Sequence, residues 1–211
     1  MESRKKLLGF NFVRQEFRLI LASASPRRAE ILRNAGFDFE VVPSHVDESL
    51  RPNEAAAAYV LRLAEEKARA AMHQFAKISA RDSVFIIGAD TVVVVHGKIM
   101  GKPSSVVNAR GMLRCLSGKA HEVYTGLAVL QGNGIARTAV EKTRVTFEPL
   151  SEKEIEDYID SEEPFDKAGA YAIQGRGGKF ISRIEGCYFN VMGLPLARLY
   201  KLLRELNGKQ Q

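Results

Sequence analysis

Two adjacent arginines stand where a helix is expected to begin. In LASASPRRAEILRNAG, residues 21–36, Ser25 is suited to the N-cap and Pro26 to the first helical position. The positive end of the helix dipole makes Arg27 and Arg28 unfavourable there by roughly 0.3–1 kcal/mol each. A helix N-terminus that adds cations to its free N–H groups is suited to an anion such as phosphate. We therefore expect an anion site, with a solvated charged turn as the alternative.

A lysine interrupts the apolar face of a predicted long helix, NEAAAAYVLRLAEEKARAAM. On a helical wheel, Lys67 lies among the apolar residues of one face, which are Val60, Leu63, Ala64 and Ala71. Such a lysine either extends to the surface or points into a cleft that holds an anion, and we favour the cleft. The sequence indicates no structural partner for Lys67, so we expect its replacement by methionine to stabilise the ligand-free protein.

An aspartate lies inside a strongly apolar predicted strand, SVFIIGADTVVVV. A carboxylate between VFII and VVVV is costly to desolvate without a cation or a hydrogen-bond donor. Ligands of α/β sheets also gather near strand ends. Asp90 is therefore the best single candidate for catalysis, and a residue of an Asx turn or bulge is the structural alternative.

Further charged residues fall at the ends of predicted elements. Asp47 and Glu48 follow a strand in PSHVDESL, and Lys102 lies in the loop KIMGKP before a helix. Each of them alone is compatible with an ordinary exposed charge. Together with Lys67 and the paired arginines they suit a metal-bound polyphosphate, because cations neutralise phosphate charge while carboxylates hold Mg²⁺ or Mn²⁺ and orient water.

The segment FDKAGAYAIQGRGG, residues 165–178, is rich in glycine but matches no standard phosphate-binding glycine motif. Its glycines are compatible with a purely conformational role. Gln174 carries both a donor and an acceptor, so it is also a candidate for pairing with the edge of a nucleobase.

Predicted helices and strands alternate, which is typical of an α/β fold with a mixed sheet. The predicted strands cover residues 18–23, 37–43, 83–95, 121–130, 135–148, 170–174, 179–184 and 188–192. The predicted helices cover residues 26–35, 54–77, 105–117, 151–161 and 195–206. SEKE predicts a capping box, and HG and QGNG predict hairpin turns. The last helix carries a predicted apolar stripe of Leu196, Leu199, Tyr200 and Leu203.

Composition limits the class of protein. The 211 residues are 45% apolar and 27% charged, which is ordinary for a globular domain or two small lobes around a cleft. A net charge of +6 is compatible with a nucleic-acid partner, but the charge is dispersed and aromatic residues make up only 8%. Cysteine and histidine spacings indicate no zinc site. We find no signal-peptide pattern and no apolar run long enough to span a bilayer, and expect a cytoplasmic protein.

Several stretches resemble the Maf family of nucleotide pyrophosphatases. They are LASASPRRAEIL, VDES, EKA, GADTVV, GKP, LSGKAHEVYTG, DKAGAYAIQG and GLPL, in family order over about residues 18–203. The resemblance implies an N-terminal extension at residues 1–17 and one Maf-like domain at residues 18–207. The implied fold is a mixed twisted sheet flanked by helices, with two lobes around a nucleotide-binding cleft.

The resemblance also implies an activity, which is hydrolysis of a nucleoside triphosphate to the monophosphate and pyrophosphate with a divalent metal. The matching branch acts on dTTP and UTP, and modified pyrimidine nucleotides are further candidate substrates in a housecleaning or cell-division role. The family is often dimeric. A non-catalytic nucleotide-binding regulator of septum formation is the main alternative, and a nucleic-acid-binding module is another.

The resemblance assigns roles to ten residues of this chain. The implied phosphate-binding residues are Ser23, Ser25, Arg27 and Arg28. Asp90 matches the proposed general base, and the other polar positions of the catalytic cleft are Glu48, Lys67 and Lys102. Glu48 and Asp90 are the expected metal ligands. The positions linked to the choice of base are Arg27, Thr91 and Gln174.

Overall fold

The computed structural model describes residues 17–74 and 83–208, and its centre is one mixed sheet. The strands are β1 (Arg18–Leu21), β2 (Glu40–Val41), β3 (Val84–Val95), β4 (Lys98–Met100), β5 (Ala120–Gln131), β6 (Ala136–Phe147) and β7 (Ile181–Glu185). They are arranged in the order β2-β1-β3-β5-β6-β7, with β4 also paired to β3. β1 is parallel to β2 and β3, and all other pairs are antiparallel.

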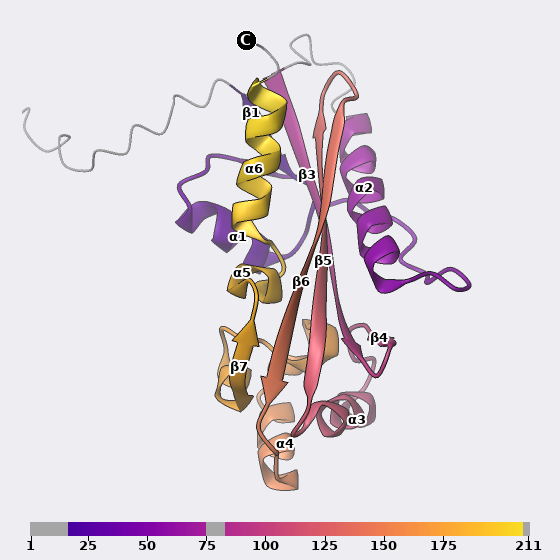
Figure 1. The fold of residues 1–211 in the computed structure, drawn as a ribbon, viewed down its shortest axis with the longest axis vertical. Coiled ribbons are helices and arrows are strands. Elements are labelled where there is room, and N and C mark those ends of the chain that lie inside the picture. Colours follow the sequence, from indigo (N-terminus) through magenta and orange to yellow (C-terminus); the bar gives the residue numbers. More distant parts are fainter. Residues whose placement is uncertain (1–16, 75–82, 209–211) are drawn as a thin grey trace, which may run out of the picture.

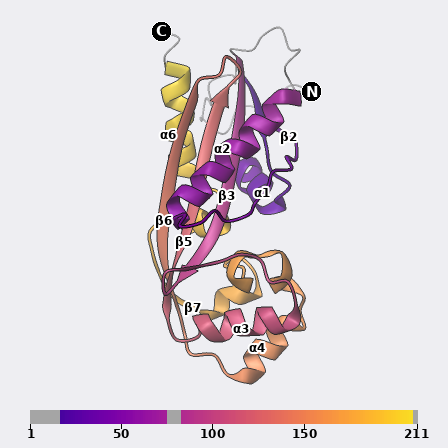
Figure 2. The ribbon, with the colours of Figure 1, turned by 90° about the vertical axis from the view of Figure 1, so that its right-hand side faces the viewer.

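Helices cover both faces of the sheet (Figures 1 and 2). They are α1 (Pro26–Asn34), α2 (Ala56–Gln74), α3 (Val106–Leu116), α4 (Glu152–Ile159), α5 (Tyr188–Met192) and α6 (Leu196–Asn207). Three short 3₁₀ segments are η2 (Glu163–Asp166), η3 (Ala168–Ala170) and η4 (Arg176–Phe180). α2 packs on one face with Ile20 of β1, whereas α1 and α6 pack on the other face with Leu19 and Leu21. This alternation follows from the two-residue period of a strand.

Three long strands join two lobes. β3, β5 and β6 each have 12 residues and continue well past the end of β1. Their far halves form a second core with α3, α4 and the 3₁₀ segments, in which Val93, Val123 and Phe147 are buried. In Figure 2 this lobe lies below the one that carries α1, α2 and α6. The predicted α/β class, mixed sheet and two lobes are confirmed.

Two glycines allow α2 to lie very close to the sheet. A Cβ atom on Gly88 of β3 would lie 2.0 Å from the backbone oxygen of Ala64 in α2. A Cβ atom on Gly126 of β5 would lie 2.2 Å from the backbone oxygen of Val60. Only glycine fits at these contacts. Gly88 also pairs with β5 in an unbroken register, so it is part of a continuous strand and not of a bulge or turn.

Two predicted strands are wrong. Residues 170–174 begin at the last residue of η3, in which Gly169 has φ +70°, and the Ala172 N–H donates to the Tyr158 hydroxyl instead of to a neighbouring strand. Residues 188–192 form the short helix α5, because the buried Asn190 side chain donates to the backbone oxygen of Val123 and to Thr143. Both errors arise because tertiary hydrogen bonds override a local alternating pattern. The short strand β4 was not predicted.

Other local expectations have mixed outcomes. The capping box of Ser151 and Glu154 is present, and the hairpin turns lie between β3 and β4 and between β5 and β6. Tyr200 is wrong as a member of the buried stripe, because it is 48% exposed and Leu202 is buried instead. The proposed extension at residues 1–17 lies outside the described residues except for its last position.

Within the described ranges, no helix is both long enough and apolar enough to span a membrane.

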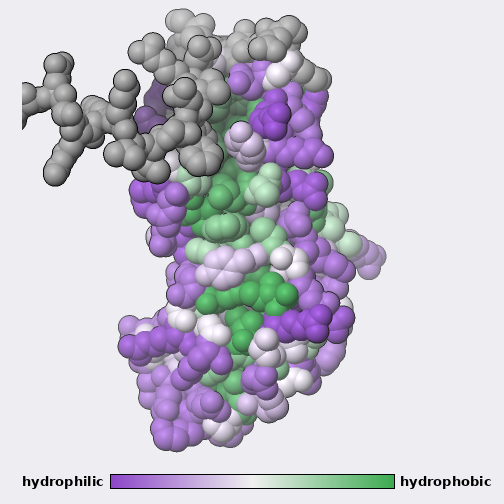
Figure 3. Space-filling view, turned by 60° about the vertical axis from the view of Figure 1, so that its left-hand side comes forward, coloured by the Kyte–Doolittle hydropathy of each residue, from purple (hydrophilic) through white to green (hydrophobic). Residues whose placement is uncertain are grey.

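Figure 3 shows a band of apolar surface between hydrophilic margins on the side that carries α1, α5 and α6. The aromatic side chains of Tyr188 and Phe189 in α5 are 41% and 40% exposed.

Candidate active site

A pocket of about 470 Å³ lies at an interruption in the pairing of β3. β1 pairs with β3 at residues 84–87 and β4 pairs with it at residues 93–95, so neither covers the stretch between them. Asp90 and Thr91 belong to this uncovered stretch and line the pocket. The first lobe contributes the β1–α1 connection, and the second contributes residues on both sides of η3. The pocket lies beyond the carboxyl end of β1, as expected for ligands near strand ends, but Asp90 itself lies in the middle of β3.

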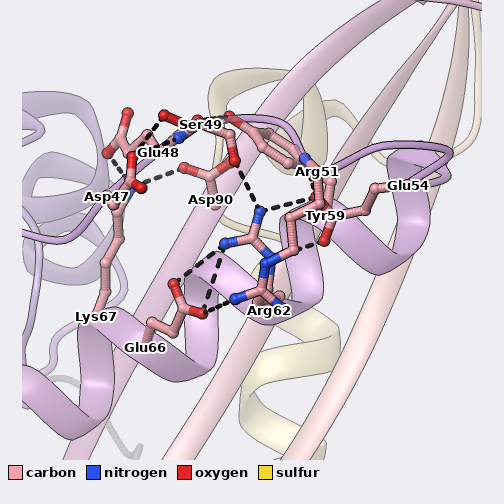
Figure 4. Close-up of polar contacts among 10 residues, drawn as sticks. All are labelled: Asp47, Glu48, Ser49, Arg51, Glu54, Tyr59, Arg62, Glu66, Lys67 and Asp90. Atoms are coloured by element: carbon pink, nitrogen blue, oxygen red, sulfur yellow. Dashed lines mark hydrogen bonds and ion pairs between the residues drawn. The ribbon is translucent and has the colours of Figure 1, made fainter.

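Lys67 joins two carboxylates in this pocket (Figure 4). Its Nζ lies 2.7 Å from Asp90 Oδ1 and 2.7 Å from Glu48 Oε1. The Lys67 and Asp90 side chains are 10% and 11% exposed, whereas Glu48 is 55% exposed. The expectation that Lys67 has no structural partner is thus wrong, and the cause is tertiary, because the close contact at Gly88 brings α2 over Asp90.

The surroundings move the pKa values of the two carboxyl groups in opposite directions. Burial raises the pKa of Asp90, although the charges of Lys67 and Arg28 oppose the change. Burial also acts to raise the pKa of Glu48, but the hydrogen bond and charge of Lys67, with the charge of Lys102, prevail and lower it. A pair separated in this way is suited to different roles, in which Asp90 is the stronger base and Glu48 stays ionised.

The two arginines of α1 have different surroundings. Arg28 is buried and donates to the backbone oxygen of Gly193 at 2.8 Å, to Ser23 Oγ at 2.9 Å and to Thr91 Oγ1 at 3.0 Å. Arg27 is half-buried and contacts the backbone oxygen of Asp166, in the other lobe, at 3.4 Å. Burial lowers the pKa of both arginines. Arg28 therefore has structural partners of its own, and Arg27 is the better placed to meet a ligand.

The start of α1 presents free backbone donors to the pocket. Ser25 is the N-cap as predicted, but its side chain makes no capping hydrogen bond, and no acidic residue occupies the first turn. Ser23 is buried and its Oγ accepts from the Ser25 N–H at 3.2 Å. Both serines and Arg27 line the pocket. This arrangement is suited to an anion.

The remaining predicted residues divide into two groups. Lys102 is exposed and lines the pocket from the loop after β4, and Thr91 lines it beside Arg28. Asp47 points elsewhere, because its carboxylate accepts from the backbone and hydroxyl of Ser49. Gln174 is exposed and lies outside the pocket lining. The structure thus gathers nine of the ten assigned residues in the pocket lining and leaves Gln174 outside it.

Sequence reasoning did not single out three further lining residues, Tyr59, Asp166 and Tyr171. Tyr59 donates its hydroxyl to the backbone oxygen of Glu48 at 2.7 Å, and burial raises its pKa to about 12. Asp166 is joined by an ion pair to Lys167. Tyr171 is buried and its hydroxyl pairs with His121 Nε2 at 2.8 Å. Nothing in the spacing of Tyr59 indicated this contact.

Several known proteins are similar to this chain. A dTTP/UTP pyrophosphatase of Syntrophus aciditrophicus (strain SB) is 48% identical over 192 residues, which cover 90% of this chain and 91% of that protein. A dTTP/UTP pyrophosphatase of Carboxydothermus hydrogenoformans is 50% identical over 192 residues, covering 89% of this chain and 98% of that protein. The solved Staphylococcus aureus Ham1 protein covers 92% of this chain at 12% identity, with a TM-score of 0.45, and 100% of its own chain is aligned.

A sequence model of the family described as Maf-like protein matches residues 18–206. That match includes every residue of the pocket lining. The stretches that resembled the Maf family therefore lie in the matched region, and the chain belongs to the Maf family.

Proposed function

We propose that this protein hydrolyses dTTP and UTP to the monophosphate and pyrophosphate. The observation that carries the proposal is one pocket in which Lys67 joins Asp90 and Glu48 beside the N-terminus of α1. The dTTP/UTP pyrophosphatases that are about half identical to it support the substrate class.

The pocket residues divide the chemistry between them. The free N–H groups of α1 and the cations of Arg27 and Lys102 bind the phosphates. Asp90 accepts a proton as a water oxygen attacks the α-phosphorus, and the bond from that phosphorus to the bridging oxygen breaks. The bridging oxygen leaves with its electron pair on pyrophosphate, whose charge the cations stabilise. Arg28 holds Ser23 and Thr91 in place through its hydrogen bonds.

The donor set of the pocket fits a divalent cation such as Mg²⁺ or Mn²⁺. Asp90 and Glu48 supply carboxylate oxygens that lie close together, because both are paired with Lys67. Mg²⁺ is commonly held by one or two carboxylates together with substrate phosphates. Within the described ranges, no three His, Cys, Asp or Glu side chains form a cluster that could hold a metal ion. The bound ion would supply charge neutralisation at the phosphates.

Measurement of pyrophosphate release from dTTP, UTP, CTP, ATP and GTP tests the proposal. We expect dTTP and UTP to be cleaved far faster than the other three, with one pyrophosphate formed per monophosphate. Nucleotide binding without turnover would instead favour a non-catalytic regulator. Tight, salt-sensitive binding to long nucleic acid without turnover would favour a nucleic-acid module.

Gln174 is proposed to contribute to the choice of base. Uracil and thymine present acceptor, donor and acceptor groups, so a carboxamide can pair with one oxygen and the N3–H together. A flipped amide would also pair with cytosine, so a second donor must hold the orientation. We expect Gln174→Ala to reduce the preference for UTP over CTP, which reaches roughly 10⁴-fold where wrong bases leave polar groups unpaired. Unchanged selectivity would exclude Gln174 as a reader of the base.

The proposal has three further parts. The protein also acts on modified pyrimidine triphosphates, forms a homodimer and is located in the cytoplasm. Adding modified nucleotides to the same assay tests the first, and light scattering on the purified protein tests the second. A fluorescent fusion in the source cell tests the third.

A further inference from the structure

Glu48 lies in a long irregular connection between β2 and α2. Residues 42–55 join β2 to α2 and contain no helix or strand. Connections longer than roughly 12–15 residues without secondary structure usually have a function. The Glu48 side chain is 55% exposed, yet its carboxylate meets Lys67 at 2.7 Å. The position of Glu48 therefore depends on what holds the backbone of this connection, both at the pocket and outside it.

Arg62 of α2 makes those contacts (Figure 4). Its guanidinium donates to Glu54 Oε1 at 2.6 Å and to Oε2 at 2.8 Å, in a bidentate pair at the end of the connection. The same guanidinium donates to the backbone oxygen of Ser49 at 3.1 Å, directly after Glu48. Glu66, one turn further along α2, accepts from it at 3.2 Å. One side chain thus ties two points of the connection to a helix.

This cluster differs from the surface ion pairs of the molecule. The side chains of Arg62 and Glu54 are only 13% and 9% exposed, whereas those of the bidentate pair Arg114–Glu152 are 53% and 64% exposed. Bidentate pairs shielded from water hold their geometry better than exposed pairs. Tyr59 adds a hydrogen bond to the backbone oxygen of Glu48. Arg62 is absent from the pocket lining, so it acts on the pocket through the connection and through Tyr59, over whose ring its guanidinium lies at 5.4 Å.

We propose that Arg62 is a positioning residue for Glu48, which it holds against Lys67 by fixing the backbone at Ser49 and Glu54. The kinetic consequence rests on the proposed function. Supporting residues of this kind typically change activity or metal affinity by about 10–100-fold when they are removed. Lysine cannot reproduce the planar fork of arginine, so Arg62→Lys should restore only part of the loss.

The experiment compares Arg62→Met and Arg62→Lys with the matched control Arg114→Met. We expect Arg62→Met to lower kcat/KM for dTTP by about 10–100-fold, Arg62→Lys to be intermediate, and Arg114→Met to stay within about twofold of the wild type. Amide hydrogen exchange over residues 44–50 should be faster in Arg62→Met and unchanged in Arg114→Met. Adding Arg62→Met to Glu48→Gln should cause little further loss, because both act through one carboxylate.

The inference is overturned if Arg62→Met retains wild-type kcat/KM with unchanged exchange, or if its loss is the same in the Glu48→Gln background. If Arg62→Met does not fold, Glu54→Gln provides the same comparison, because it weakens the clamp with little change in shape. A wild-type protein that releases no pyrophosphate would contradict the proposed function. The exchange difference over residues 44–50 would then still decide the inference, with no difference overturning it.

Discussion

Asp90 and Thr91 are neighbours in the chain but project from opposite faces of β3. Asp90 meets Lys67 of α2, and Thr91 meets Arg28 of α1. A ligand in the uncovered stretch of β3 can therefore contact groups from both helical layers. At the scale of single residues, the pocket depends on this alternation and on the shared lysine.

Asp90→Asn tests the assignment of the base. We expect kcat for dTTP to fall by at least about 10²-fold, which is the scale for loss of a general base. The melting temperature should change little, because the amide has the same shape and removes a buried charge whose pKa is raised. Pyrophosphate release and circular dichroism provide the two measurements. Near-normal turnover would remove Asp90 from the mechanism.

Lys67→Met should destabilise the protein, in contrast to the expectation from sequence. The change leaves Asp90, 11% exposed, without its main counter-ion. We expect a loss of up to about 3 kcal/mol near pH 8, the lower end for breaking a buried pair, since Arg28 still faces Asp90.

The loss in Lys67→Met should depend on pH. Without lysine the pKa of Asp90 rises further, so at low pH the carboxyl is neutral and costs little to bury. The difference from wild type should therefore be largest above that pKa and shrink as the pH falls through it. Urea unfolding at several pH values measures this, and Lys67→Met combined with Asp90→Asn should recover stability. A loss independent of pH would contradict the electrostatic explanation.

At the scale of elements, the contact between α2 and the sheet sets the site. Gly88→Ala would place a Cβ atom 2.0 Å from a backbone oxygen of α2, so the helix must move. We expect a destabilisation of about 1–3 kcal/mol together with reduced activity, because Lys67 moves with the helix. Chemical denaturation and pyrophosphate release measure both effects.

Gly111→Ala is the matched control for Gly88→Ala. Gly111 lies in the exposed surface of α3 with no atom within 4 Å of an added Cβ. Alanine is the better helix former, so this variant should gain up to about 1 kcal/mol and keep its activity. Equal effects of the two substitutions would show that close packing at Gly88 is unimportant.

At the scale of the whole molecule, β3, β5 and β6 pass through the cores of both lobes. We therefore expect one cooperative unfolding transition. Phe147→Ala in the second core and Leu206→Ala in the first should both lower the midpoint of the same transition, because each leaves a cavity that costs about 2–5 kcal/mol. Far-ultraviolet and near-ultraviolet circular dichroism should give coincident curves. Two separated transitions in either variant would show that the lobes unfold independently.

The sequence alone determined most elements and the chemistry that they carry. The period of the apolar residues predicted α2 with Lys67 on its buried face, and the cost of desolvating a carboxylate singled out Asp90. Proline and serine at residues 25–26 predicted the start of α1 beside two arginines. These signals are local, because each depends on residues within a few positions of one another.

Only the tertiary structure decided which groups meet. Lys67 and Asp90 are 23 positions apart, and their contact depends on a helix that approaches the sheet at Gly88. Three other features likewise depend on partners that are distant in the sequence. They are the burial of Arg28, the hydrogen bond from Arg62 to the connection that carries Glu48, and the helical form of residues 188–192. Local spacing fixes the face of a helix or strand on which a side chain lies. The burial of that side chain and its partner on another element depend on how whole elements pack, and the pattern of a single sequence does not record that packing.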